Sequence, residues 1–159
     1  MAAAYAIFPN EGQYTEPSAY TKVTNGDGDV ILDKEKDVET VPVIDRGVAF
    51  VMTDLLQSVV RNGTGTGASI ASQPVAGKTG TTSDNYDAWF VGCTPQYTAA
   101  RWVGNDVKIE LTQGSPAAAR RWGKIMGQIC SGTARENLPD RPDNVIQSGG
   151  EYYLDGTYS

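Results

Sequence analysis

Residues 78–82, which read Lys-Thr-Gly-Thr-Thr, are the part of this sequence best suited to chemistry. An apolar lead-in, 74–77, precedes them, and a polar turn separates them from a second apolar run at 88–93. A lysine and neighbouring hydroxyls bind a carboxylate well, because each can donate a hydrogen bond to the anion. Backbone N–H groups at the same strand end can stabilise a developing oxyanion. The pattern therefore predicts a strand end that holds a carboxylate-bearing substrate against the edge of a sheet.

The composition is that of a globular protein and argues against a nucleic-acid partner. The chain has 159 residues, of which 40% are apolar and 20% are charged, and its formal net charge is -6. No basic stripe accompanies this acidic balance, so we expect no binding to nucleic acid. No apolar run approaches the roughly 18 residues of a membrane-spanning helix, and the first residues lack a signal-peptide pattern. We therefore expect any export signal or membrane anchor to lie outside this sequence.

The sequence contains no histidine, which removes several kinds of catalysis from consideration. Ser-His-Asp and Cys-His arrangements cannot be assembled from this chain alone. We expect no metal and no cofactor, since Cys93 and Cys130 are too few for a zinc site and too far apart for a Cys-x-x-Cys motif. Both thiols are predicted to be buried, and a disulfide between them remains an open alternative.

Hydrophobic patterning predicts an α+β fold in which helices flank an antiparallel sheet. The run 88–93 is apolar on both faces, as in a central strand that is covered on each side. Asp45 is expected to cap a long helix that ends at Gly63, and Ser115 with Pro116 is expected to begin a second one. The expected elements are helices over 1–8, 45–62 and 115–131, a hairpin of 19–24 with 30–32, strands over 75–81, 87–94 and 97–103, and a short strand over 152–154.

The two long helices are expected to bury stripes of large apolar side chains. The three tryptophans are likewise predicted to lie in the core and to contact no substrate. The predicted core residues are Val48, Val51, Met52, Leu55 and Val59 on the first helix, Trp122, Ile125, Met126 and Ile129 on the second, and Trp89 and Trp102 on the strands.

The acidic turn at 25–29 has the composition of a calcium loop. However, Val30 and Lys36 stand where an EF-hand needs glycine and glutamate, so we interpret the segment as a plain turn. The composition then changes near residue 132, since prolines and a Gly-Gly pair interrupt residues 133–159. We predict a domain portion over 1–132 and a C-terminal tail over 133–159 that docks on it. Because the sequence opens inside a helix-forming stretch, we expect the parent domain to be longer.

With these elements in place, the chain resembles the C-terminal half of the transpeptidase domain of a bifunctional (class A) penicillin-binding protein. The resemblance rests on Pro74-Val-Ala-Gly-Lys-Thr-Gly-Thr-Thr, which includes one of the motifs of that family. Further matches are Met1-Ala-Ala-Ala-Tyr-Ala-Ile-Phe, the stretch from Val48 to Gly67, Asp87-Ala-Trp-Phe-Val-Gly, Pro95-Gln-Tyr and Trp102-Val-Gly. The match covers residues 1 to about 132 well and the tail loosely.

The resemblance implies a serine acyl-transfer reaction that cross-links peptidoglycan and is blocked by β-lactams. It implies that Lys78 supplies positive charge and hydrogen-bonds the serine of the family's Ser-x-Asn motif. Thr79 and Thr81 are expected to bind the terminal carboxylate of a D-Ala-D-Ala stem peptide, and the N–H of Thr81 to donate to the oxyanion. Gly80 is expected to let the strand pass close to the substrate.

The nucleophile of that family is not found in this chain. None of the six lysines has a serine three residues before it, so there is no Ser-x-x-Lys. Ser83-Asp84-Asn85 spells Ser-x-Asn but lies just after the strand, so we assign it no role. We therefore expect a partner, namely the N-terminal half of the transpeptidase domain, either cleaved or on a separate chain. This chain alone is expected to be inactive.

Three alternatives remain open. The first is a noncatalytic carboxylate-binding module, and the second is a stand-alone serine β-lactamase, which would also need Ser-x-x-Lys. The third is a nucleotide-binding protein, because 72–79 is one residue away from a P-loop, with Ser72 at the first glycine position. The resemblance implies a place on the extracytoplasmic face of a bacterial membrane and a glycosyltransferase domain in the full-length protein.

Overall fold

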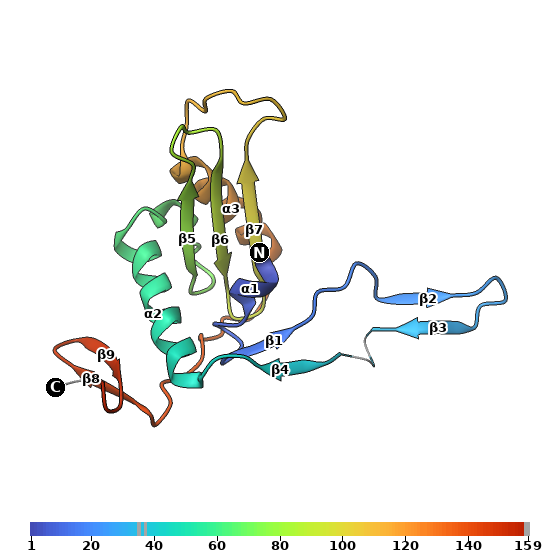
Figure 1. Cartoon of the computed structure of the whole chain (residues 1–159), viewed down its shortest axis with the longest axis horizontal. Coiled ribbons are helices and arrows are strands. Elements are labelled where there is room, and N and C mark those ends of the chain that lie inside the picture. The colour runs from blue at the N-terminus through green and yellow to red at the C-terminus, as the bar shows by residue number, and fades with distance from the viewer. Residues whose placement is uncertain (35, 37, 158–159) are drawn as a thin grey trace.

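The computed structural model describes residues 1–34, 36 and 38–157 (Figure 1). Its centre is a three-stranded antiparallel sheet in the order β5 (Ala76–Thr81), β6 (Ala88–Cys93) and β7 (Thr98–Val103). The middle strand is β6, as its two-sided apolar pattern predicted. The predicted meander and the α+β class with flanking helices are therefore confirmed.

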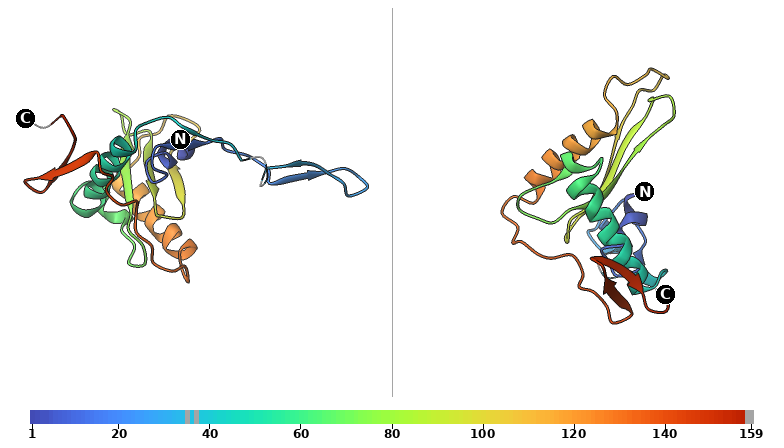
Figure 2. Two further views of the ribbon diagram at one scale, coloured as in Figure 1. Left: turned by 90° about the horizontal axis from the view of Figure 1, so that it is seen from below. Right: turned by 90° about the vertical axis from the view of Figure 1, so that its left-hand side faces the viewer.

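Helices cover both faces of this sheet (Figure 2). On one face lies α3 (Ser115–Ile129), where the rings of Phe90 and Trp122 meet edge to face with centroids 5.1 Å apart. On the other face lies α1 (Ala2–Ala6), next to a smaller cluster that contains Ala76 and Cys93. The sheet is thus the middle layer of the domain portion, and β5 is one of its two outer strands.

The long helix α2 (Arg46–Asn62) packs beside β5 (Figure 1). Its first turn is capped by Asp45, whose Oδ1 accepts hydrogen bonds from the N–H groups of Gly47 at 2.8 Å and Val48 at 3.2 Å. It ends at Gly63, and a short 3-10 helix, η1 (Thr66–Ala68), follows in the loop that leads back to the sheet. Both predicted ends of α2 are confirmed, because each was set by a local capping residue.

The predicted buried face of α2 is wrong. Its large apolar stripe is half-buried or, at Leu55, 49% exposed. The helix instead turns a mostly smaller set of side chains toward the rest of the chain, which allows close approach of its backbone. The buried residues of α2 are Gly47, Ala49, Thr53, Leu56 and Val60.

The predicted face of α3 is correct only in part. Trp122 and Met126 are buried, but Ile125 and Ile129 are 43% and 49% exposed. Small residues again make the close contacts, since a Cβ added at Gly123 would lie 2.9 Å from the carbonyl oxygen of Gly67. The predicted start of α3 is off by one position. Ser115 was expected to be the N-cap, but the helix includes Ser115 and its N-cap is Gly114.

The tryptophans do not share one environment. Trp122 is buried, Trp89 is half-buried, and Trp102 is 42% exposed, so its assignment to the core is wrong. The indole N–H of Trp102 donates to Asp87 Oδ1 at 2.8 Å, and its ring lies on that of Trp89 with centroids 6.4 Å apart. Trp102 pairs with Trp89 in the register, so its ring lies on the sheet face away from Phe90 and α3.

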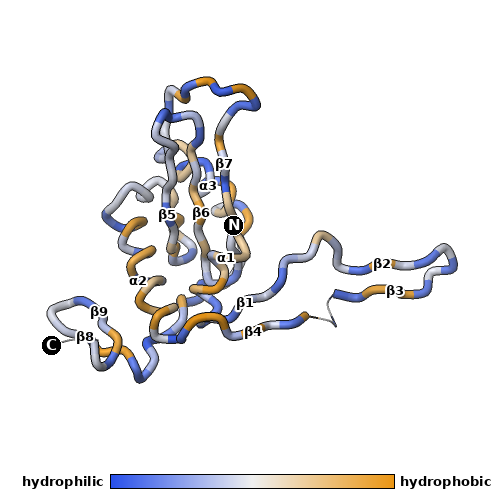
Figure 3. The backbone as a smooth tube through the Cα atoms, in the orientation of Figure 1, coloured by the Kyte–Doolittle hydropathy of each residue, from blue (hydrophilic) through white to orange (hydrophobic). Residues whose placement is uncertain are grey.

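An extended arm leaves the sheet between α1 and α2 (Figure 1). It consists of two antiparallel pairs, the first of β1 (Gln13–Thr15) with β4 (Thr40–Pro42) and the second of β2 (Lys22–Thr24) with β3 (Val30–Asp33). The predicted hairpin is confirmed, whereas β1 and β4 were not predicted because they pair across the whole arm and no short turn joins them. Figure 3 shows hydrophobic residues in the middle of the arm as well as on β6 and α2.

The tail contains a second hairpin, β8 (Val145–Ser148) with β9 (Glu151–Leu154), of which only the second strand was predicted. It contacts the first turns of α2. Asn144 Nδ2 donates to Asp45 Oδ1 at 2.9 Å, and the ring of Tyr152 meets that of Phe50 edge to face at 5.0 Å. The tail therefore supports the same helix end that Asp45 caps.

Candidate active site

The predicted site residues all lie on β5, which has a strand neighbour on one side only. The register places Thr79 opposite Phe90 and Lys78 opposite Val91. Residues directly opposite in an antiparallel pair share a face, so Thr79 lies on the α3 face and Lys78 on the opposite face. Consecutive residues of the motif thus supply groups to both sides of one strand end.

The strand becomes more accessible toward its C-terminal end. Gly77 is buried, Lys78 is exposed, Thr79 is 9% exposed, Gly80 is half-buried and Thr81 is exposed. In Figure 1, α2 runs beside β5 on the side away from β6. The accessible part of the strand is therefore the part that carries the Lys-Thr-Gly-Thr motif.

The direction of the backbone groups follows from the hydrogen bonds at the end of the hairpin. Thr82 N donates to Asp87 O at 3.1 Å, which continues the β5–β6 register by one pair. In an antiparallel ladder, hydrogen-bonded pairs alternate with pairs whose N–H and C=O groups point away. Even-numbered residues of β5 therefore bond β6, and the N–H and C=O groups of Thr79 and Thr81 point to the open edge. An N–H at Thr81 is available there for an incoming anion.

Lys78 turns its side chain over this edge. Its Nζ donates to the carbonyl oxygen of Thr79 at 3.0 Å and lies 3.5 Å from Thr79 Oγ1. In the part of the chain that the structure describes, no carboxylate forms an ion pair with Lys78. The edge thus carries a positive charge that is free to attract an anion, in a protein whose net charge is negative.

A residue outside the motif also reaches the site. Thr64, in the glycine-rich loop after α2, has its Oγ1 2.6 Å from Thr79 Oγ1. Thr64 was not among the residues predicted from the sequence. A threonine between Gly63 and Gly65 carries no local sign of such a contact, and only the nearness of the loop to the motif could have suggested it.

The two glycines of the motif region have different surroundings. A Cβ added at Gly77 would lie 2.5 Å from Phe90 Cζ and 2.8 Å from the carbonyl oxygen of Val91. A Cβ added at Gly80 would find only Trp89 Cβ, at 3.5 Å. Gly77 is therefore required by packing within the protein, whereas nothing within the described structure requires glycine at position 80.

The structure also bears on the predictions for Ser83, for the P-loop-like segment 72–79 and for the two cysteines. Ser83 lies in the turn after β5, as predicted. The P-loop alternative is contradicted, because Lys78 and Thr79 lie inside a strand that is followed by a turn and a second strand, where a P-loop needs a helix. Cys93 and Cys130 are both free and buried, and burial raises the pKa of the Cys93 thiol to about 12. The prediction of two buried thiols is confirmed.

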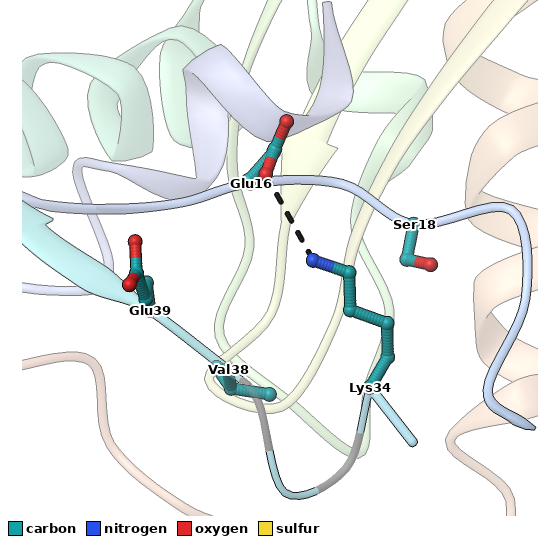
Figure 4. Close-up of a pocket in the computed structure, with 5 residues that line it drawn as sticks. All are labelled: Glu16, Ser18, Lys34, Val38 and Glu39. Carbon is teal, nitrogen blue, oxygen red and sulfur yellow. Dashed lines mark ion pairs between the residues drawn. The ribbon is translucent and has the colours of Figure 1, made fainter. Parts of the chain in front are cut away.

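Two hollows lie in very different places. One, of about 470 Å³, borders Thr81 and is also lined by Asp84, Tyr86, Asp87 and Lys108. The other, of about 350 Å³, lies midway along the arm, between its two strand pairs (Figure 4). It contains the ion pair of Lys34 Nζ with Glu16 Oε2 at 3.9 Å and has no residue of β5 in its lining. Only the first hollow is continuous with the candidate site.

The described residues contain neither a metal-binding cluster nor a membrane-spanning helix. Within residues 1–34, 36 and 38–157, no group of three or more Cys, Asp or Glu side chains is placed to hold a metal ion. In the same residues, no helix combines the length and the apolar character needed to cross a bilayer.

Comparison with known proteins gives consistent results. The family described as the penicillin binding protein transpeptidase domain matches residues 1–127. Penicillin-binding protein 1A of Clostridium acetobutylicum is 45% identical over 158 residues, which is 99% of this chain and 19% of that protein. The protein of the same name from Clostridium botulinum is 46% identical over 92% of this chain and 18% of its own length. The chain thus spans about a fifth of the length of these curated relatives.

Solved structures agree with this match. The penicillin-binding protein PonA1 from Mycobacterium tuberculosis has a TM-score of 0.76 and 29% identity, over 92% of this chain and 44% of that one. Penicillin-binding protein 1A from Haemophilus influenzae has a TM-score of 0.73 over 98% of this chain and 31% of that one. Its 20% identity supports the fold alone.

Proposed function

Because the chain belongs to the penicillin-binding protein transpeptidase family, we propose that it forms one wall of the active site of a peptidoglycan D,D-transpeptidase. The observation that carries the proposal is the open edge of β5, where a lysine without an ion pair among the described residues and outward-facing N–H groups lie together. A carboxylate and a developing oxyanion are the two groups that such an edge stabilises.

The proposed reaction is acyl transfer through a serine outside this chain. The serine oxygen attacks the carbonyl carbon of the D-Ala-D-Ala peptide bond, and the carbonyl oxygen takes up the negative charge. The carbon–nitrogen bond then breaks, the nitrogen takes up the proton that the serine hydroxyl gave up, and the terminal D-Ala leaves. An amine of a second stem peptide attacks the resulting ester, releases the serine and completes the cross-link. A β-lactam would form the same kind of ester, but its leaving group stays attached.

Each motif residue has a role in this proposal, and Lys78 and Thr81 have two. The N–H of Thr81 donates to the oxyanion, and the hydroxyls of Thr79 and Thr81 bind the terminal carboxylate. Lys78 supplies positive charge to that carboxylate and hydrogen-bonds the serine of a Ser-x-Asn motif. Gly80 leaves room for the substrate backbone, which is consistent with the open space around its Cα. Losing one oxyanion donor of this kind reduces the rate by roughly 10²–10³-fold.

We propose that the partner of this wall is the N-terminal half of the same transpeptidase domain, which would bring the Ser-x-x-Lys nucleophile. The whole protein would act outside the cytoplasmic membrane, anchored by a segment that this chain does not contain, and would carry a glycosyltransferase domain. The proposed division into a domain portion, 1–132, and a docked tail, 133–159, belongs to the same picture. The contact of Asn144 with Asp45 supports the docking.

Labelling of a native preparation with a fluorescent penicillin tests the proposal. The labelled proteins are separated on a denaturing gel, and their intact masses are measured. We expect label on a serine outside residues 1–159, whether on the same polypeptide or on one that co-purifies. Label on a residue of this chain would contradict the placement of the nucleophile. Absence of label from every species would favour the noncatalytic carboxylate-binding module.

A further inference from the structure

We propose that Thr64 is a positioning residue of the carboxylate site, which donates a hydrogen bond to Thr79 and leaves the Thr79 proton free for the substrate. This inference rests on the proposed function, since it concerns the same site. It starts from the 2.6 Å contact between the two hydroxyl oxygens, which joins the loop after α2 to the motif strand.

The Thr79 hydroxyl lies close to the open edge of β5. Although Thr79 is only 9% exposed, its Oγ1 lies 3.5 Å from the ammonium of Lys78, which reaches over the open edge of β5. The hydroxyl is therefore at the boundary between the covered α3 face and the edge where a ligand would lie.

The direction of the hydrogen bond between Thr64 and Thr79 follows from their donors and acceptors. A hydroxyl has one proton and two acceptor positions, whereas an ammonium can only donate. When a carboxylate accepts from Thr79, the single Thr79 proton is used for it, so Thr79 must accept from both Lys78 and Thr64. The order of donation is then fixed from Thr64 to Thr79 to the carboxylate. Hydrogen bonds arranged in such a chain strengthen one another.

The loop that carries Thr64 is closely packed on several sides. A Cβ added at Gly65 would lie 3.2 Å from both the Phe90 ring and Val59, and one at Gly67 would lie 2.5 Å from Arg120 Cγ. The loop is therefore held between α2, the sheet and α3. Thr64 projects from a fixed support, as a positioning group requires.

The test measures acylation of the complete transpeptidase, meaning this chain together with the part that carries the nucleophile. Two ligands are compared by intact mass over time: benzylpenicillin, which has a free carboxylate, and its methyl ester, which has none. For Thr64→Val we expect acylation by benzylpenicillin to slow by about three- to tenfold, the worth of one hydrogen bond. Acylation by the methyl ester should stay within about twofold of the wild-type rate.

Further variants separate positioning from general damage. Thr64→Ser keeps the hydroxyl and should restore the benzylpenicillin rate. Thr66→Val changes the same loop at an exposed residue for which the described structure shows no side-chain hydrogen bond, and should behave like wild type. In a Thr79→Val background, Thr64→Val should have no additional effect, because the two residues act through one contact. Thr64→Ala gives the same comparison if the valine variant does not fold.

Several results would overturn the inference. These are an unchanged benzylpenicillin rate for Thr64→Val, an equal loss with both ligands, or effects of the two threonine variants that simply multiply. They differ from failure of the proposed function, in which the wild-type protein itself would not be acylated and the inference would fall with it.

Discussion

Gly77 and Gly80 allow a sharp test of the site. A methyl group added at Gly77 is expected to lower stability, whereas one added at Gly80 is expected to slow acylation. In Gly77→Ala the new Cβ would lie 2.5 Å from Phe90 Cζ and 2.8 Å from a backbone oxygen of β6. In Gly80→Ala it would make one ordinary contact at 3.5 Å. Neither glycine has a positive φ, so an alanine backbone is allowed at both.

The magnitudes follow from these distances. Overpacking of a closed site costs about 1–3 kcal/mol, and part of β6 must move to accommodate a methyl group at Gly77. At about 2–4 °C per kcal/mol for a domain of 150–250 residues, the unfolding temperature should fall by about 2–12 °C. Gly80→Ala should instead be neutral, or more stable by about 0.4–1 kcal/mol, because alanine restricts the unfolded chain.

Gly80→Ala should affect the rate of acylation more than the unfolding temperature. At Gly80 the methyl group would occupy space that we assign to the substrate, and the same 1–3 kcal/mol corresponds to an acylation rate about 5- to 150-fold lower. The assay combines thermal unfolding with the time course of β-lactam acylation, both on the complete transpeptidase. A Gly80→Ala protein that is acylated as fast as wild type, or that is destabilised as much as Gly77→Ala, would refute the assignment of this edge as the substrate side.

Three other predictions concern single groups. Lys78→Met should slow β-lactam acylation about 100-fold with little change in unfolding temperature, because the exposed ammonium makes no ion pair among the described residues; a change below threefold would contradict its role. The bond from Asn144 is the main cause that lowers the pKa of Asp45 below 3.8. Its stabilising effect is therefore present above pH 3.8 and lost as the pH falls through the lower folded pKa. In Asn144→Ala, NMR titration should find the Asp45 pKa closer to 3.8 and acid unfolding less dependent on this group. Cys93, with a pKa of about 12, should resist iodoacetamide at pH 8 in the folded protein and react in urea; alkylation without denaturant would contradict its burial.

The sheet and the helix ends could be predicted because their signals are local. The two-sided apolar run of β6 and the capping Asp45 need no knowledge of distant residues. The faces of α2 and α3 could not be predicted in the same way. Apolar periodicity favours large side chains, whereas the structure uses small ones such as Ala49 and Gly123 to bring backbones together.

The candidate site was predictable to the same extent. The motif residues were identified from their types and from the resemblance, and the structure places them together on an open strand edge. Thr64 was missed because its contact with Thr79 spans 15 positions and depends on how α2 ends beside β5. Trp102 was assigned to the core from its residue type alone, although its strand lies at the edge of the sheet.

The alternating direction of the backbone groups along β5 determines which mutations can remove the oxyanion donor. If the anion is recognised by the N–H of Thr81, then no exchange of the Thr81 side chain, short of proline, deletes that donor. Selection for weaker β-lactam acylation can therefore act on Lys78 or Gly80, but it cannot remove this backbone donor by exchanging the Thr81 side chain. Moving the donor would require a substitution in the core layer behind β5, where a change near Phe90 would tilt the strand. Such changes would also carry a stability cost, so we expect them to arise together with compensating mutations elsewhere in the domain.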